Sequence, residues 1–150
     1  MIPKFRAWGV ERYPGLKQPA SKMHRNVSVV TTYPEGITFI LTNFSMQGDD
    51  EYSGSIIDDA ILMQSTGLKD YFGEELFEGD VIEWSYWDGF EDSGTAKIIF
   101  DKGMFKLLAV STEKSVWDNL FDCIENCSVF LQGNIYENPE LLEDKKCTQK

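Results

Sequence analysis

The sequence predicts a mainly β protein with minor α content, an α+β fold whose C-terminal half forms a small SH3-like β-barrel. Short apolar runs with alternating or continuous patterning dominate the chain, and helical periodicity is rarely sustained. Turn residues, chiefly Gly, Pro, Asp and Asn, separate these runs at short intervals. Closure into a barrel would remove the exposed edges that such short strands otherwise leave.

Residues 1–60 are expected to form a smaller N-terminal α+β part made of strands and a hairpin. Residues 5–8 predict a first short strand. Tyr13-Pro14-Gly15 then opens a stretch rich in Pro, Lys and Ser, which predicts irregular backbone as far as Arg25.

A hairpin is predicted next, because residues 27–33 and 37–42 are rich in Val, Ile and Thr and flank the turn sequence Pro34-Glu35-Gly36. The polar, acidic residues 47–54 predict a loop. The apolar positions of residues 56–63 fit one face of a short helix as well as a strand, so periodicity does not decide between them.

Residues 61–143 are predicted to form the barrel part, and residues 144–150 a polar tail. Turns are expected at Glu78-Gly79-Asp80 and at Asp101-Lys102-Gly103, where glycine accepts a positive φ. The predicted strands cover residues 76–77, 81–87, 96–100, 104–108 and 129–131.

Two short helices complete the prediction. Val116, Leu120 and Ile124 have helical spacing, which predicts a helix that starts near Ser115. The sequence Asn138-Pro139-Glu140 offers an N-cap residue, a proline at the first helical position and an acid in the first turn, so a helix of one or two turns is expected there.

The charge of the chain is unevenly distributed. Residues 1–47 contain six Lys or Arg and two Asp or Glu, which gives +4, whereas residues 48–150 contain eight against twenty-three, which gives −15 and a total of −11. The acidic part would repel nucleic acid, so nucleic-acid binding is disfavoured. The basic residues of the N-terminal segment either form a small patch or pair with the acidic remainder; they are Lys4, Arg6, Arg12, Lys17, Lys22 and Arg25.

No apolar run is long enough to cross a bilayer, and the start of the chain lacks the apolar core of a signal peptide. A cytoplasmic protein without membrane association is therefore expected. In that reducing compartment Cys123, Cys127 and Cys147 are expected to carry free thiols.

The familiar catalytic and cofactor motifs are missing, since the sequence contains neither a P-loop nor a GxGxxG pattern. The chain has a single histidine, His24, which excludes metal sites that need two histidine ligands. A zinc site of His24 with Cys123, Cys127 and Cys147 lacks the usual two-residue cysteine spacing, so small buried thiols are the favoured interpretation.

The acidic doublets Asp49-Asp50, Asp58-Asp59 and Glu74-Glu75 are interpreted as solvated loop acids. A calcium loop that began at Asp49 would have Ala60 where a bidentate glutamate is required. We therefore expect no catalytic residue, no cofactor and no metal ligand.

An aromatic cluster is the candidate protein-interaction site; it comprises Trp84, Tyr86, Trp87 and Phe90. On a strand Trp84 and Tyr86 share one face while Trp87 points to the other, so the three rings cannot all enter one barrel interior. Core filling and interface use are both open for these rings.

Three blocks resemble the YopX family of phage and prophage proteins: Lys4-Phe5-Arg6-Ala7-Trp8, residues 62–70 leading to 76–82, and residues 133–142. The chain departs from the family at Asp70-Tyr71-Phe72-Gly73, which replaces a more polar turn. The resemblance implies a phage or prophage origin and an SH3-like barrel with a smaller α+β part. It implies no activity and no catalytic residues.

The leading functional hypothesis is a non-enzymatic accessory protein that associates with proteins through an acidic barrel with exposed aromatics. The partner is expected to be a second copy of the chain, as a homo-oligomer, or another phage or host protein. The alternatives are a DNA-associated regulator that uses the basic N-terminal segment, and an enzyme with an acidic metal site.

Overall fold

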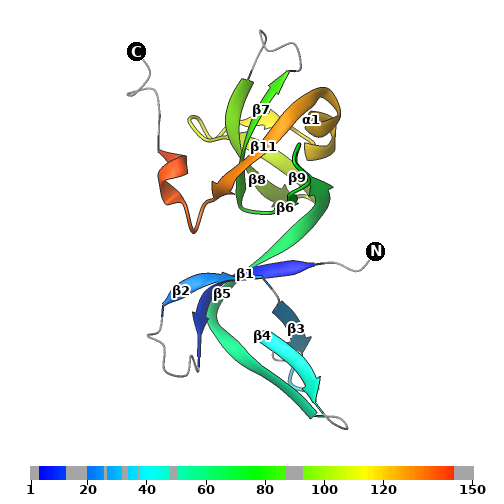
Figure 1. Cartoon of the computed structure of the whole chain (residues 1–150), viewed down its shortest axis with the longest axis vertical. Coiled ribbons are helices and arrows are strands. Elements are labelled where there is room, and N and C mark those ends of the chain that lie inside the picture. Colours follow the sequence, from blue (N-terminus) through cyan, green and yellow to red (C-terminus); the bar gives the residue numbers. More distant parts are fainter. Residues whose placement is uncertain are drawn as a thin grey trace. The chain divides into compact units, whose positions relative to one another are not determined.

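The computed structural model describes residues 4–12, 20–25, 27–31, 34–36, 38–47, 51–86 and 93–143. The chain forms two compact units, unit 1 (Met1–Gln64) and unit 2 (Ser65–Lys150). Antiparallel strands make up most of both units, as Figure 1 shows, which confirms the prediction of a mainly β protein with minor helix.

Unit 1 is a twisted antiparallel sheet with the strand order β2-β1-β5-β4-β3. Its strands are β1 (Phe5–Glu11), β2 (Ser21–His24), β3 (Val27–Thr31), β4 (Thr38–Gln47) and the first part of β5 (Glu51–Lys69). The predicted hairpin is confirmed, because β3 and β4 pair from Val27↔Thr42 to Thr31↔Thr38.

Two expectations for unit 1 are wrong. The stretch expected to be irregular contains β2, a four-residue strand with one apolar residue, Met23, and no apolar alternation; β2 is nevertheless a strand because its backbone pairs with β1. The loop expected over residues 47–54 is shorter, since β4 extends to Gln47 and β5 starts at Glu51.

Residues 56–63, whose periodicity fits a helix as well as a strand, belong to strand β5. The register with β1 shifts by one residue between Trp8 and Val10, and Asp59 opposite this shift has φ of +52°. This β-bulge interrupts the two-residue alternation that marks a strand. Gly9 lies at the bulge, where an added Cβ would come within 2.6 Å of the Ile57 side chain.

Unit 2 contains a five-stranded antiparallel sheet in the order β10-β9-β8-β7-β11, and β6 pairs with the end of β5. Its elements are β6 (Glu75–Phe77), β7 (Asp80–Tyr86), β8 (Ser93–Asp101), β9 (Met104–Ala109), β10 (Ser115–Trp117), α1 (Leu120–Asn126), β11 (Cys127–Asn134) and the 3₁₀ turn η1 (Pro139–Leu142). The β8–β9 connection is a two-residue turn, Lys102-Gly103, because Asp101 already pairs with Met104.

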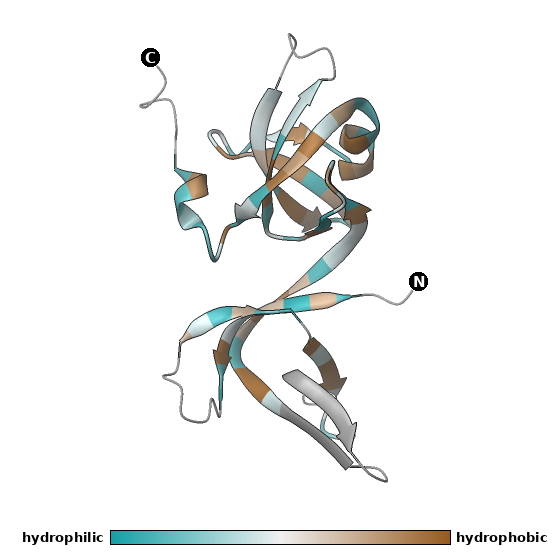
Figure 2. Ribbon diagram, viewed as in Figure 1, coloured by the Kyte–Doolittle hydropathy of each residue, from teal (hydrophilic) through white to brown (hydrophobic). Residues whose placement is uncertain are grey.

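One hydrophobic core fills unit 2. It combines inward side chains of the sheet with Leu120 and Cys123 of α1, and the helix carries the hydrophobic residues drawn brown in Figure 2. The buried members of this core are Leu76, Ile82, Trp84, Ala96, Ile98, Leu107, Leu120, Cys123, Cys127 and Val129.

The five-stranded sheet is strongly curved. In its order β10 and β7 are separated by two strands, a spacing of about 14 Å in a flat sheet. The rings of Trp117 on β10 and Trp84 on β7 nevertheless meet edge to face with centroids 5.8 Å apart. Within the described part of the chain the edge strands β10 and β11 do not pair, so the unit is an open, curved sheet there and the predicted barrel closure is not found.

The helical predictions need two corrections. Ser115–Trp117 is strand β10, and α1 begins only at Leu120, because the side chain of Asn119 accepts a hydrogen bond from the Phe121 N–H (2.8 Å) and caps the helix. The expected turn at Pro139 is present, but the side chain of Asn138 accepts from the Asn134 N–H instead of capping it. The predicted tail at 144–150 lies outside the described residues.

Candidate functional site

Two of the four candidate interface aromatics lie inside unit 2. Trp84 is only 8% exposed, and its ring contacts the rings of Tyr86 and Trp117. Tyr86 is half-buried and packs against the same core. Trp84 therefore belongs to the core and Tyr86 packs against it, while Trp87 and Phe90 lie outside the described residues.

A different aromatic cluster is exposed on unit 2. Tyr71 is 67% exposed and Phe72 is 75% exposed, although both are large hydrophobic rings. With Phe130 of β11 they form a three-ring cluster, the aromatic triad, whose centroids are 5.3 to 5.7 Å apart. The triad is a contiguous apolar surface on an otherwise acidic chain.

The turn that presents the triad is held in place by Asp70, a buried residue. One carboxylate oxygen accepts hydrogen bonds from the N–H groups of Phe72 (2.9 Å) and Glu74 (2.8 Å), and the other accepts from Leu131 on β11 (3.0 Å). The Tyr71 N–H also donates to the Val129 carbonyl (2.7 Å). The backbone of the exposed rings is thus fixed before any partner arrives.

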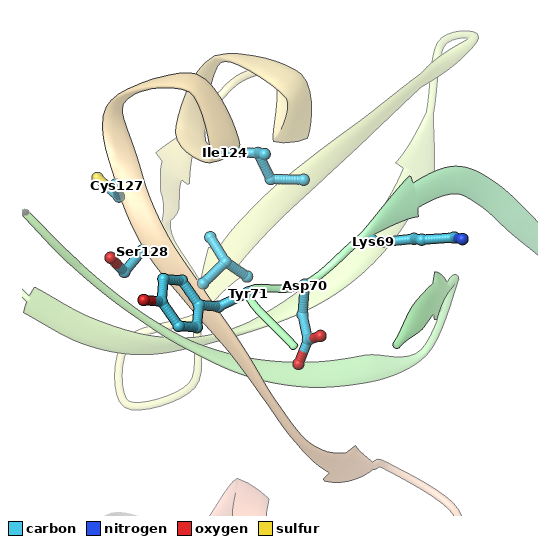
Figure 3. Close-up of a pocket in the computed structure, with 7 residues that line it drawn as sticks. Lys69, Asp70, Tyr71, Ile124, Cys127 and Ser128 are labelled. Atoms are coloured by element: carbon cyan, nitrogen blue, oxygen red, sulfur yellow. The ribbon is translucent and has the colours of Figure 1, made fainter. Parts of the chain in front are cut away.

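A cleft of about 460 Å³ lies beside Tyr71. Figure 3 shows Ile124 of α1 on one side and the ring of Tyr71 on the other, with Ser128 of β11 beside the Tyr71 ring. The residues that line the cleft are Lys69, Asp70, Tyr71, Ile124, Cys127, Ser128 and Val129. The volume lies within the range of about 300 to 1,000 Å³ typical of ligand pockets.

Cys123 and Cys127 carry free, buried thiols, as predicted. Burial is the main reason that the pKa of each thiol is raised, and the neighbouring Cys127 raises the pKa of Cys123 further. Both thiols therefore stay protonated at neutral pH, which makes them poor nucleophiles. Cys147 lies outside the described residues.

His24 is buried, with a ring nitrogen 3.2 Å from the Gly9 carbonyl oxygen. Across the described ranges no three His, Cys, Asp or Glu side chains gather into a possible metal site.

The basic N-terminal residues are divided between interior and surface. Arg6 is 2% exposed, and Arg12 binds the Asp58 carboxylate through an Nη2–Oδ1 contact of 2.6 Å. These hydrogen bonds from Arg12 lower the pKa of the Asp58 carboxyl. Lys4, Lys22 and Arg25 are exposed, and Lys17 lies outside the described residues.

The Glu78-Gly79-Asp80 turn has a structural role. Gly79 has φ of +90°, its carbonyl accepts from the Ile135 N–H (3.0 Å), and the buried carboxylate of Asp80 accepts from the Phe77 N–H (2.7 Å). The hydrogen bond between Gly79 and Ile135 thus joins two of the blocks that carry the family resemblance, residues 76–82 and residues 133–142.

Sequence reasoning missed the triad as a site, although the signal was present. Two adjacent aromatic residues stand in a turn between Asp70 and Gly73. Gly73 has φ of +88°, and the chain reverses its direction at this turn. Tyr71 and Phe72 lie at the tip of the turn, where the two side chains cannot both reach a core.

Comparison with known proteins gives consistent matches over nearly the whole chain. A family model described as YopX protein matches residues 4–143. The crystal structure of protein EF1440 from Enterococcus faecalis superposes with a TM-score of 0.63 and 29% identity, and the match covers 95% of this chain and 99% of that chain.

The crystal structure of protein yopX from Bacillus subtilis matches with a TM-score of 0.55 and 18% identity, over 93% of this chain and 98% of that chain; at this identity it supports the fold alone. No curated protein matches the sequence. None of the described helices has the length and apolar character required to span a membrane.

Proposed function

The chain belongs to the YopX family, and from that premise we propose that it is a non-enzymatic accessory protein of a phage or prophage that acts by binding another protein through the aromatic triad. The observation that carries the proposal is the exposure of Tyr71 and Phe72 beside Phe130 on a rigid turn. Aromatic side chains are the commonest energetic anchors of protein interfaces.

Three further features support association as the role of this surface. Asp70 fixes the turn, so little conformational entropy is lost when a partner covers the rings. The rings stand next to a cleft, which gives a partner a concave surface to fill. The high pKa of the two thiols also disfavours cysteine chemistry.

The DNA-associated alternative finds less support. Arg6 is buried, and the exposed Arg12 is already bound to the Asp58 carboxylate, so two of the six cations of the N-terminal segment are engaged within the protein. The chain as a whole carries a net charge of −11, which opposes approach to phosphate.

The proposal is tested with the double variant Tyr71→Ala/Phe72→Ala and the control Phe100→Ala. Phe100 is an exposed ring on β8 that pairs with Phe105, so the control removes an aromatic surface of the same kind elsewhere in unit 2. Both variants should fold, because Tyr71 and Phe72 are largely solvent-exposed and Phe100 is about half exposed.

Sedimentation velocity detects self-association, and differential capture from cells that carry the phage detects a different partner. We expect the wild type and Phe100→Ala to associate equally and the double variant to lose the association. The proposal is wrong if wild type and double variant behave identically in both measurements.

A further inference from the structure

The cleft beside the triad opens on the outer edge of β11. In an antiparallel pair the N–H and C=O of one residue point to the same side, and successive residues alternate. The Val129 carbonyl accepts a hydrogen bond from the Tyr71 N–H, and the Leu131 N–H donates to the Asp70 carboxylate. The backbone N–H and C=O groups of Val129 and Leu131 therefore point away from β7. The Cys127 carbonyl and the Val129 N–H therefore face the same outer edge, where both residues line the cleft.

The walls of this cleft are apolar on two sides. Tyr71 forms one wall and Ile124 of α1 the other. Phe121 precedes Ile124 by three residues, so it lies on the same face of the helix, and its ring is half exposed. A side chain placed in the cleft would thus have apolar contacts on both sides and the triad at its rim.

The charges around the cleft are mainly negative. The charged residues within three positions of a lining residue are Lys69, Asp70, Glu74, Asp122 and Glu125. Asp70 is buried with its carboxylate engaged, which leaves three exposed carboxylates and one ammonium group. Unit 2 as a whole has eight lysines against eighteen acids, a net charge of −10.

We propose that the cleft binds an extended segment of a different protein, one whose backbone pairs with the Cys127 carbonyl and the Val129 N–H at the edge of β11. This inference rests on the proposed association function and specifies its partner. The segment places one apolar side chain between Tyr71 and Ile124 and carries Lys or Arg beside it, because the surrounding charge is negative. A second copy of the chain fits less well, since it brings another net charge of −11.

The experiment sorts a display library of random peptides against the full-length chain. We expect the enriched peptides to combine an apolar residue with neighbouring Lys or Arg. The best of them is then synthesised with a fluorescent label, and its dissociation constant is measured by polarisation at low and high salt. Binding should weaken as salt rises.

Backbone pairing is tested with the same peptide N-methylated at alternate residues. One N-methylated frame removes the N–H group that pairs with the Cys127 carbonyl and leaves side chains and charges unchanged, so the affinity should fall by about tenfold, whereas the other frame should bind almost normally. Among protein variants, Ser128→Trp should block the cleft and abolish binding, while Phe100→Ala should bind like the wild type.

The outcomes separate this inference from the function on which it rests. If the affinity is left unchanged by N-methylation in both frames, or if the peptide binds Ser128→Trp as tightly as the wild type, backbone pairing with β11 is wrong. If no peptide is enriched while Tyr71→Ala/Phe72→Ala still loses an association, the inference fails and the proposed function stands. Self-association that Ser128→Trp abolishes would identify a second copy as the occupant and overturn the heterologous partner.

Discussion

Gly79 shows how far single positions can be inferred from sequence. The Glu-Gly-Asp turn before an apolar run predicts a positive φ, and the backbone has φ of +90° there. The same turn chemistry allows Asp80 to accept from a nearby backbone N–H, as it does from Phe77, but no local pattern shows that Asp80 is buried, because that burial depends on strands far along the chain.

Substitution of Gly79 by valine should lower the free energy of unfolding by roughly 1–3 kcal/mol, because a β-branched side chain is strained at positive φ. Denaturant unfolding measures the change. Gly79→Asn is the matched control, since asparagine tolerates the left-handed region better and should lose less. A Gly79→Val protein of unchanged stability would contradict the structural role of the turn.

The Arg12–Asp58 pair gives a pH-dependent prediction. The pKa of Asp58 is lowered in the folded chain by its hydrogen bonds from Arg12. The pair therefore stabilises the fold above the pKa that Asp58 has when unfolded, and this contribution is lost as the pH falls through the lower folded-state pKa.

Asp58→Asn should accordingly be less stable than the wild type at neutral pH, and the difference should shrink as the pH is lowered into the acidic range. Thermal midpoints of both proteins across that range provide the measurement, with low salt to limit screening. A difference that stays constant with pH would show that the carboxylate charge is not involved.

Among the elements, those governed by local chemistry were predictable and those governed by distant pairing were not. The β3–β4 hairpin follows from its Pro-Glu-Gly turn and β-branched flanks. Strand β2 does not, because its four residues include only one apolar side chain and only pairing with β1 makes it a strand. Alternation placed Trp84 and Tyr86 on one face, but only their contact with Trp117 on β10 shows that this face is the core.

The Tyr71–Phe72 turn should depend on Asp70 for its attachment to β11. Asp70→Ala removes the acceptor of three backbone N–H groups, one of them on β11, and we expect a loss on the order of 2–3 kcal/mol. Hydrogen exchange should show faster exchange at Phe72, Glu74 and Leu131. Asp70→Asn keeps one acceptor oxygen, so its stability should lie between those of the wild type and Asp70→Ala. Unchanged exchange rates in Asp70→Ala would show that Asp70 does not hold the turn on β11.

For the whole molecule, net charge decides how association responds to salt. Two copies of a chain with net charge −11 repel each other, so any self-association through the triad should strengthen as ionic strength rises. Sedimentation at micromolar concentration and two ionic strengths measures this. A monomer under both conditions rejects the homo-oligomer and leaves a different protein as the partner of the triad.

The continuity of β5 also determines how the chain can be dissected. Gln64, the last residue of unit 1, pairs with Phe5, and the next residue, Ser65, pairs with Phe77 in unit 2. Proteases cut accessible, unpaired segments, and this junction offers none. Limited digestion should therefore spare the bond between the two units, and a truncation made there would end each fragment on a residue that its own sheet requires.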